Sequence, residues 1–168
     1  MTMTQSATIE TARLVLRPIS REEAEHIAAG SRDGRLWSEG YPRGDDQDVA
    51  RMLLGMAPPA DPLFGPLQVA LLGSGTVIGG IGFMGPPDAD GTVEIGYGVA
   101  PEAEGRGYTT EAVLALLHWA FTVGGVRRVI ATTALDNYGS QRVLDKAGLT
   151  LTRSDETLHH YEITRTNG

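Results

Sequence analysis

The residues best suited to chemistry lie in one stretch, from residue 93 to residue 112. Two glycines, Gly105 and Gly107, stand two positions apart, between an apolar run that ends at a proline and a second apolar run. This pattern predicts a strand, a glycine-rich turn and a helix that begins at about Gly107 or Tyr108. The first-turn N–H groups of a helix have no intrahelical partner, and the helix dipole places partial positive charge there. We therefore interpret the turn as a cradle for a pyrophosphate group.

A turn of this kind can also form without binding any ligand. A glycine in a strand-to-helix connection often serves turn geometry alone, and this alternative stays open. Two nucleotide loops are disfavoured, because the dinucleotide fingerprint needs a third glycine where this chain has Thr110, and the ATP-binding P-loop needs a Gly-Lys-Ser/Thr ending that is absent. The remaining hypothesis is a phosphate loop of another type.

Two segments resemble the central motifs of the GCN5-related N-acetyltransferase (GNAT) superfamily. The first runs from Val99 to Ala112, and the second runs from Asn137 to Leu149. The opening residues 11–18 also fit the branch that includes the ribosomal-protein N-terminal alanine acetyltransferases, so the likeness spans residues 11 to 150. The resemblance implies an α/β fold with mixed α+β character: a central mixed sheet of six to seven strands with a splayed parallel pair, flanked by about four helices.

The same resemblance implies that acetyl-CoA is the co-substrate. Its pantetheine arm would lie between the splayed strands and pair with backbone groups of Tyr97, Gly98 and Val99. Asn137 would hydrogen-bond the cofactor near its thiol end. The pyrophosphate would be held in the turn, by Glu104, Gly105, Arg106, Gly107, Tyr108, Thr109 and Thr110.

Two residues of the turn depart from the family pattern. The motif begins with Gln or Arg where this chain has Glu104, and it ends with Gly or Ala where this chain has Thr109. A carboxylate beside a pyrophosphate is unfavourable unless it points away. Arg106 is a candidate phosphate ligand, and an exposed arginine without a ligand is the alternative.

The implied reaction is direct attack by an amine on a thioester, so the amine must lose a proton and the departing thiolate should gain one. Glu94 is the leading base, acting directly or through water, because it lies in an apolar strand next to the splay; a sheet-edge ion pair is the alternative. Relatives carry a tyrosine seven residues after the motif asparagine, but this chain has Leu144 there. Ser140 matches the serine that the ribosomal-protein branch has in this helix, so the resemblance implies that it gives the thiol-side hydrogen bond, and satisfying first-turn backbone groups is its alternative role.

The loop between residues 31 and 44 carries two large aromatic residues, Trp37 and Tyr41. They are candidates for the acceptor site, because binding residues concentrate on loops, and packing of the loop onto the core is the alternative. The expected acceptor is an amine of a small molecule or of a protein or peptide N-terminus. A non-catalytic acyl-CoA-binding or regulatory module is the alternative function, and Glu104 and Leu144 are the departures that favour it.

The surrounding sequence predicts the elements that position these residues. Alternating or continuous apolar runs predict strands, and apolar i, i+3, i+4 stripes predict helices. Because a right-handed crossover through the long apolar helix joins two strands, those strands are expected to be parallel neighbours. The expected strands are residues 13–17, 66–72, 76–83, 93–99, 126–133, 149–152 and 157–164, and the expected helices are residues 20–30, 45–54, 109–123 and 136–148.

Length, composition and charge limit the remaining possibilities for domain organisation, partners, metal sites and location. The 168 residues, 41% of them hydrophobic, predict a single domain over residues 1–168, with a flexible tail at residues 1–8. A net charge of −7 disfavours nucleic acid and membrane surfaces as partners. No metal site is expected, because the chain has no cysteine and its four histidines lack paired ligand spacing. No apolar run reaches the roughly 18 residues of a membrane span, and no signal segment is evident, so a cytoplasmic location is expected. A homodimer remains possible.

Overall fold

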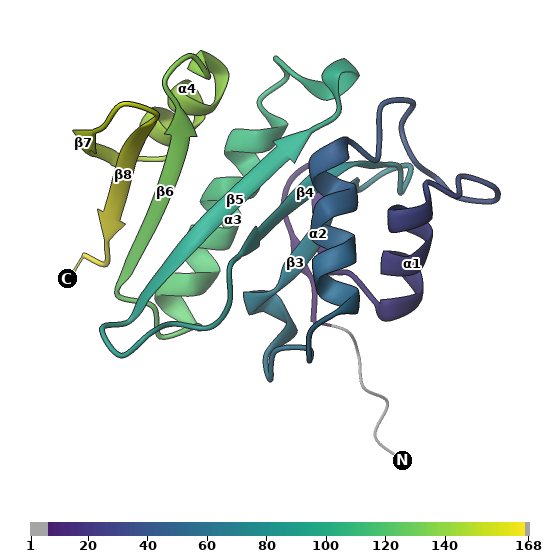
Figure 1. Cartoon of the computed structure of the whole chain (residues 1–168), viewed down its shortest axis with the longest axis horizontal. Coiled ribbons are helices and arrows are strands. Elements are labelled where there is room, and N and C mark those ends of the chain that lie inside the picture. The colour runs from purple at the N-terminus through teal and green to yellow at the C-terminus, as the bar shows by residue number, and fades with distance from the viewer. Residues whose placement is uncertain (1–6, 167–168) are drawn as a thin grey trace.

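An eight-stranded mixed sheet forms the centre of the molecule, with the strand order β1-β2-β3-β4-β5-β6-β8-β7 (Figure 1). The computed structural model describes residues 7–166, so most of the tail expected at residues 1–8 lies outside the described part. The strands are β1 (Ile9–Glu10), β2 (Leu14–Pro18), β3 (Pro66–Leu71), β4 (Val77–Phe83), β5 (Thr92–Val99), β6 (Arg128–Ala134), β7 (Thr150–Ser154) and β8 (Leu158–Thr164). The helices are α1 (Arg21–Ala29), α2 (Gly44–Leu54), α3 (Tyr108–Thr122) and α4 (Tyr138–Lys146), with 3₁₀ turns at Pro62–Phe64 and Pro101–Ala103.

The sheet confirms the expected α/β fold and adds one strand to it. The predicted strands and helices lie where the periodicity places them, with differences of a few residues at their ends. The additional strand, β1, is two residues long and pairs antiparallel with β2 through Ile9–Leu16 and Glu10–Val15. A strand of two residues is too short to produce an alternation that sequence analysis can detect.

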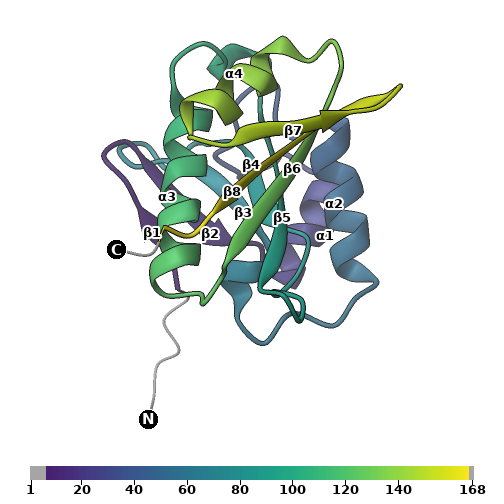
Figure 2. The same ribbon diagram turned by 90° about the vertical axis from the view of Figure 1, so that its left-hand side faces the viewer.

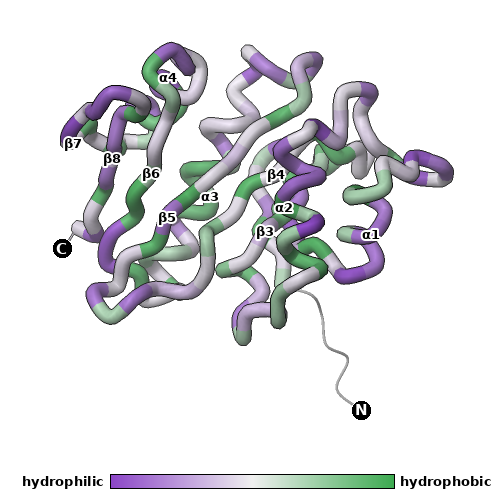
Figure 3. Tube along the Cα trace, viewed as in Figure 1, coloured by the Kyte–Doolittle hydropathy of each residue, from purple (hydrophilic) through white to green (hydrophobic). Residues whose placement is uncertain are grey.

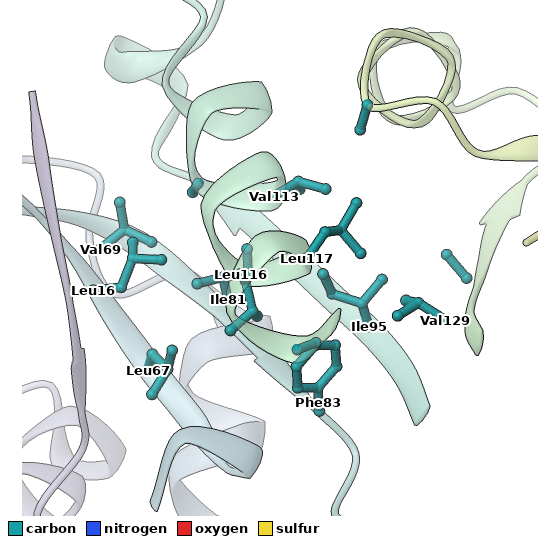
Figure 4. Close-up of a cluster of buried hydrophobic side chains, with 14 of the residues drawn as sticks. Leu16, Leu67, Val69, Ile81, Phe83, Ile95, Val113, Leu116, Leu117 and Val129 are labelled. Atoms are coloured by element: carbon teal, nitrogen blue, oxygen red, sulfur yellow. The ribbon is translucent and has the colours of Figure 1, made fainter. Parts of the chain in front are cut away.

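Helices cover both faces of the sheet (Figure 2). α1 and α2 pack against each other on one face, and α3 lies on the opposite face. The larger core cluster joins the buried side of α3 to β2 through β6 (Figure 4). A smaller cluster beneath α1 and α2 contains Trp37 and Tyr41. The two clusters therefore anchor the helices that flank the candidate site.

α3 is the element that fixes the centre of the fold. Its residues are hydrophobic over most of its length, whereas α2 carries hydrophilic stretches (Figure 3). Val113, Leu116 and Ala120 are completely buried, at the spacing that places them on one helix face. Within residues 7–166, no helix combines the length and the hydropathy that crossing a membrane requires.

The parallel strands β5 and β6 pair only at one end. Their register comprises Thr92–Arg128, Val93–Val129 and Glu94–Ile130. Beyond these pairs, β5 stays paired with β4 and β6 stays paired with β8, so the two strands diverge (Figure 1). This confirms the expected splayed parallel pair, with α3 as the crossover between its strands.

Candidate active site

The turn between β5 and α3 has the backbone conformation of an anion cradle. Gly105 and Gly107 adopt φ values of 75° and 81°, in the left-handed region that favours glycine. Gly107 is the N-cap of α3 and offers no side chain to the first-turn N–H groups. The amides of Tyr108, Thr109 and Thr110 therefore begin the helix without a side-chain cap from this residue. We call residues 104–110 the cradle turn.

An ion pair from Arg13, the residue before β2, supports the first turn of α3. Arg13 Nε lies 2.7 Å from Glu111 Oε1, and its guanidinium carbon lies 4.4 Å from the centre of the Tyr108 ring. Arg13 Nη1 also donates to the carbonyl of Arg106 at 3.0 Å, and Thr11 donates to Glu111. Burial raises the pKa of Glu111, but the hydrogen bonds from Thr11 and Arg13 outweigh it and hold the pKa below its ordinary value. The acid that follows the cradle turn in the first turn of α3 is thus paired with a cation.

Glu104 and Arg106 lie exposed on the cradle turn. Within residues 7–166 neither side chain forms an ion pair, and the Glu104 amide donates to the carbonyl of Pro101 at 3.2 Å. The assignment of Arg106 to a cofactor phosphate stays a prediction. The expectation that the Glu104 carboxylate points away from the phosphates stays a prediction as well.

The edge of β5 that faces β6 is free beyond the three paired positions. The Met84 amide donates to the carbonyl of Glu94 at 2.9 Å, and the Ala100 amide donates to the carbonyl of Ile78 at 2.7 Å. Since hydrogen-bonding direction alternates along an antiparallel pair, the even-numbered residues of β5 face β4. The backbone groups of Tyr97 and Val99 therefore point toward the diverging side.

Gly98 does not share this orientation, and its assignment to the pantetheine arm stays a prediction. It is paired with Gly80 of β4, and the alternation directs its amide and carbonyl to that strand. A Cβ at Gly98 would collide with the guanidinium of Arg43. The close approach of Arg43 is thus a structural reason for a glycine at this position.

A pair of hydroxyl groups links the divergent end of β5 to α4. The Tyr97 hydroxyl lies 2.8 Å from Ser140 Oγ and donates to the Ser140 carbonyl at 3.2 Å. Burial is the main reason why the pKa of Tyr97 rises from 10.0 to about 12, although its hydrogen bond with Ser140 acts in the opposite direction. We call Tyr97 and Ser140 the hydroxyl pair. Sequence analysis assigned only the backbone of Tyr97, and the alternation of β5 is the signal that its side chain faces α3 and α4.

Asn137 and Ser140 are brought together at the start of α4. Asn137 is the N-cap, and its Oδ1 accepts a hydrogen bond from the Ser140 amide at 3.1 Å. This cap occupies the amide oxygen and leaves the side-chain NH₂ of Asn137 as a donor. Leu144, at the position where relatives carry a tyrosine, is completely buried in the larger core cluster.

Thr133 is a further polar residue of this region that sequence analysis missed. It lies on β6 beyond the last pair with β5, and its side chain is buried. Among residues 7–166, its hydroxyl has no hydrogen-bond partner. A buried hydroxyl without a partner is costly, so it is a natural contact for a polar ligand between the strands.

Glu94 lies on the opposite face of β5 from Tyr97. It is half-buried, at the last position where β5 pairs with β6, and it shares its face with Gly96 and Gly98. Within residues 7–166 its carboxylate forms no ion pair, so the sheet-edge ion pair considered as the alternative is not observed. Its role as a base stays a prediction.

The two aromatic residues of the loop differ in their surroundings. Trp37 is 8% exposed, packs edge-on against Tyr41 with ring centres 5.4 Å apart, and donates from Nε1 to Glu23 at 3.3 Å. These are the contacts expected if Trp37 packs the loop onto the core. Tyr41 is also buried, and it lines an apolar pocket on the α2 side of the sheet. We call this pocket, which has a volume of about 290 Å³, the α2 pocket.

Comparison with known proteins defines the class to which this fold and site belong. The model of the acetyltransferase (GNAT) domain matches residues 13–150. The chain therefore belongs to the GNAT acetyltransferase family.

Individual relatives agree with this assignment. The uncharacterized N-acetyltransferase YjdG of Bacillus subtilis (strain 168) is 36% identical over 85 residues, which are 51% of each chain, so this chain spans about half of that relative's length. The solved GNAT-family acetyltransferase from Bacillus anthracis has a TM-score of 0.71 at 24% identity and covers 95% of this chain and 99% of its own. Microcin C7 self immunity acetyltransferase MccE, solved with acetyl-CoA and AMP, has a TM-score of 0.68 at 16% identity, with coverage of 92% and 93%. Similarity at such identities establishes the common fold.

Proposed function

We propose that this chain transfers the acetyl group of acetyl-CoA directly to an amine. The observation that carries the proposal is the uncapped N-terminus of α3, which follows β5 at the point where β5 and β6 have diverged. An uncapped helix start binds anions, and a free strand edge pairs with amide groups. Together they match a ligand that carries a diphosphate at one end and amides in its arm. Membership of the GNAT family supports the same ligand.

The residues of the cradle turn suit a diphosphate. A Cβ at Gly105 would meet no atom within 4 Å, so the backbone of the turn is open to a ligand on that side. Arg13 compensates the charge of Glu111, which would otherwise repel phosphate. Thr133 offers a hydroxyl without a protein partner, among residues 7–166, to the polar arm. The protein groups present therefore fit the proposed co-substrate.

Bound acetyl-CoA would supply an activated thioester, at which the amine nitrogen forms a C–N bond while the C–S bond breaks and its electron pair goes to sulfur. Glu94 would accept the proton from the nitrogen, through water. Ser140 would donate a hydrogen bond to the departing sulfur, and Tyr97 would support Ser140 as the second member of the hydroxyl pair. The side-chain NH₂ of Asn137 would orient the same end of the ligand.

Gly107→Val tests the cradle turn. A β-branched residue at φ 81° is strained, and its Cβ would lie 3.4 Å from Arg13 Nη2, so the turn must change shape. We expect isothermal titration calorimetry to show loss of acetyl-CoA binding, and a thiol-release assay to show loss of turnover. The matched control is Gly34→Val, which has a similar φ of 73° in a loop with open space around it. Equal acetyl-CoA affinity in both variants would contradict the proposal.

A non-catalytic acyl-CoA-binding or regulatory module is the second candidate function. It is favoured by Leu144, which is completely buried and provides no proton donor at the position of the tyrosine in relatives. Tight acetyl-CoA binding without thiol release on any amine would support this second candidate. The hydroxyl pair favours catalysis, because it places a different donor group at the start of α4.

The remaining sequence expectations stay predictions. They are a single domain, a cytoplasmic location, a possible homodimer, and the absence of nucleic-acid and membrane partners. The roles of Trp37 in the acceptor site and of Arg106 at the phosphates belong with them.

A further inference from the structure

The α2 pocket reaches the part of β5 that lies beyond its last pair with β6. It lies between α2 and strands β3, β4 and β5, on the sheet face opposite α3. Its lining includes Gly96 and Tyr97, which follow the last pair between the two strands, Glu94–Ile130. A molecule in this pocket would therefore approach the divergent strands from the face opposite the hydroxyl pair.

The floor of the α2 pocket is bare backbone. Gly82 of β4 is directly paired with Gly96 of β5, and the pair Gly80–Gly98 lies two positions along. The second pair is covered, because Arg43 lies over Gly98 and the carboxylate of Asp46 lies 3.0 Å from the position of a Cβ at Gly80. The first pair lines the pocket. Gly82 is itself approached by the Gly65 carbonyl and Pro66, at 2.8 and 2.9 Å from the position of a Cβ, so the open space lies over Gly96, where only the tip of Met84 comes near, at 3.1 Å.

The walls of the α2 pocket are apolar. Ile19, Val49 and Met52 contribute from the helical layer, and Met84 contributes from the end of β4. Met52 and Met84 are 45% and 64% exposed, so the pocket mouth presents apolar surface to solvent. Flexible methionines adapt to apolar bodies of different shapes.

The polar groups inside the α2 pocket are already engaged with one another. The Asp46 carboxylate accepts hydrogen bonds from Arg43 at its backbone N, Nε and Nη2, at 2.9, 3.0 and 3.1 Å. The Tyr41 hydroxyl accepts from Gln68 Nε2 at 3.4 Å. These contacts reduce the hydrogen-bonding capacity left for a hydroxyl or second ammonium group of a ligand, which loses its water on entering the pocket. Polyhydroxylated and polycationic acceptors are therefore disfavoured.

One carboxylate remains at the rim. The side chain of Asp45 is 86% exposed and lies 3.9 Å from Arg43 Nη1. Its charge attracts a cationic amine to the mouth of the pocket before the amino group loses its proton and moves to the reacting centre. The combination of one rim acid with an apolar interior distinguishes a monoamine with a hydrocarbon body from other amines.

We propose that the acceptor of this enzyme is a small primary monoamine with an apolar body, such as an arylalkylamine or a branched alkylamine, bound in the α2 pocket. This inference rests on the proposed acetyl transfer. The volume of about 290 Å³ lies at the lower end of ligand sites and suits a small molecule. The body lies against Gly96, and the amino group points toward the gap between β5 and β6. There its nitrogen bonds to the acetyl carbon, its proton passes to water or Glu94, and the C–S bond breaks with its electron pair going to the sulfur, which leaves as a thiolate.

An amine panel tests the substrate class in the intact protein. Thiol release is measured with phenethylamine, isoamylamine, spermidine and an alanine-initiated peptide. We expect kcat/KM for the two apolar monoamines to exceed that for spermidine and for the peptide by about tenfold or more. Preference for spermidine or for the peptide would overturn the inference while leaving acetyl transfer in place. Failure of the protein to bind acetyl-CoA would overturn the proposed function, and this inference with it.

A matched pair of substitutions tests the location. Met52→Trp fills the mouth of the α2 pocket, whereas Met56→Trp adds the same side chain at a residue that is 55% exposed and outside the pocket lining. We expect Met52→Trp to raise KM for phenethylamine by about tenfold with unchanged affinity for acetyl-CoA, and Met56→Trp to leave both constants unchanged. Equal KM values in the two variants, with both folded by circular dichroism, would overturn the assignment of the pocket.

Discussion

At the scale of single residues, the hydroxyl pair gives the candidate site a donor even though Leu144 occupies the position of the tyrosine. The position of the usual tyrosine is occupied by the buried Leu144, and Tyr97 reaches Ser140 from the opposite side of the divergent strands. Because the Tyr97 phenol stays protonated well above neutral pH, it can serve continuously as a donor to Ser140. Ser140 is then free to direct its own hydrogen toward the sulfur.

Substitutions in the hydroxyl pair should be non-additive. We expect Ser140→Ala to lower kcat on the order of a hundredfold, as for loss of one transition-state donor, and Tyr97→Phe to lower it about tenfold. If Tyr97 acts through Ser140, the double variant loses no more than Ser140→Ala. Tyr138→Phe, at an exposed residue beside the pair, is the control. A fully additive double variant would contradict the coupling.

The raised pKa of Tyr97 sets the direction in which pH changes its contribution to stability. The folded pKa of Tyr97 is raised from 10.0 to about 12, so its contribution to stability is complete below pH 10 and is lost as pH rises toward 12. Activity should therefore show no decline from this residue at neutral or mildly alkaline pH. Tyrosinate absorbance in Tyr97→Phe, compared with the parent, identifies its ionisation.

A substitution of Glu94 tests how the acceptor amine loses its proton. We expect Glu94→Gln to lower kcat/KM about a hundredfold at neutral pH, because the acceptor then loses its proton without a positioned base. The deficit should narrow as pH approaches the pKa of the acceptor amine, where the neutral amine is abundant. Glu22→Gln, on the exposed side of α1, serves as the control. A deficit that stays constant with pH would exclude Glu94 as the base.

At the scale of elements, the start of α3 depends on β2. The ion pair between Arg13 and Glu111 joins residues 98 positions apart and places a cation beside the cradle turn. The depressed pKa of Glu111 means that its contribution to stability is present above its unfolded-state pKa and is lost as pH falls through the folded value. Because both side chains are partly exposed, this contribution is small.

The ion pair should matter more for ligand affinity than for folding. We expect Arg13→Met to weaken acetyl-CoA binding about three- to tenfold, because Glu111 then faces the phosphates uncompensated. Adding Glu111→Gln to this variant should restore part of the affinity. Arg51→Met, which breaks an exposed ion pair on α2, should leave binding unchanged. No recovery in the double variant would show that Arg13 acts by another route.

The elements that sequence analysis predicts well are those defined by neighbouring residues. Gly105 and Gly107 are recognisable because a left-handed backbone favours glycine, and the strands and helices are recognisable from local periodicity. The hydroxyl pair and the Arg13–Glu111 ion pair are not, because their partners are distant in sequence and meet only through the sheet. The α2 pocket was missed for the same reason: the register that places Gly82 against Gly96 is a property of two paired strands.

At the scale of the whole molecule, the sheet consists of two groups of strands that are joined along a short paired stretch of β5 and β6. β1 through β5 and β6 through β8 are hydrogen-bonded to each other only through the three pairs of β5 and β6 within residues 7–166, and α3 bridges them. A ligand arm between the diverging strands would add contacts to both groups. Ligand binding should therefore stabilise the molecule as a unit.

This coupling predicts a specific pattern of protection. Acetyl-CoA at a hundredfold excess over its Kd should stabilise the folded state by about 2.7 kcal/mol and raise the melting temperature. Hydrogen exchange should slow at the amides of Tyr97 and Val99 more than at Gly98, whose amide already faces β4. Gly107→Val should show neither change. Equal slowing at Gly98 would contradict the proposed contact with the free strand edge.

The paired glycines beneath the α2 pocket make acceptor choice open to engineering. A methyl group at Gly96 would meet only the flexible tip of Met84, at 3.1 Å, whereas one at Gly82 would press against the Gly65 carbonyl and the Pro66 backbone at 2.8 and 2.9 Å. A saturation library at position 96 should therefore yield folded enzymes with graded preferences for shorter amines. The same library at position 82 should yield mostly misfolded protein.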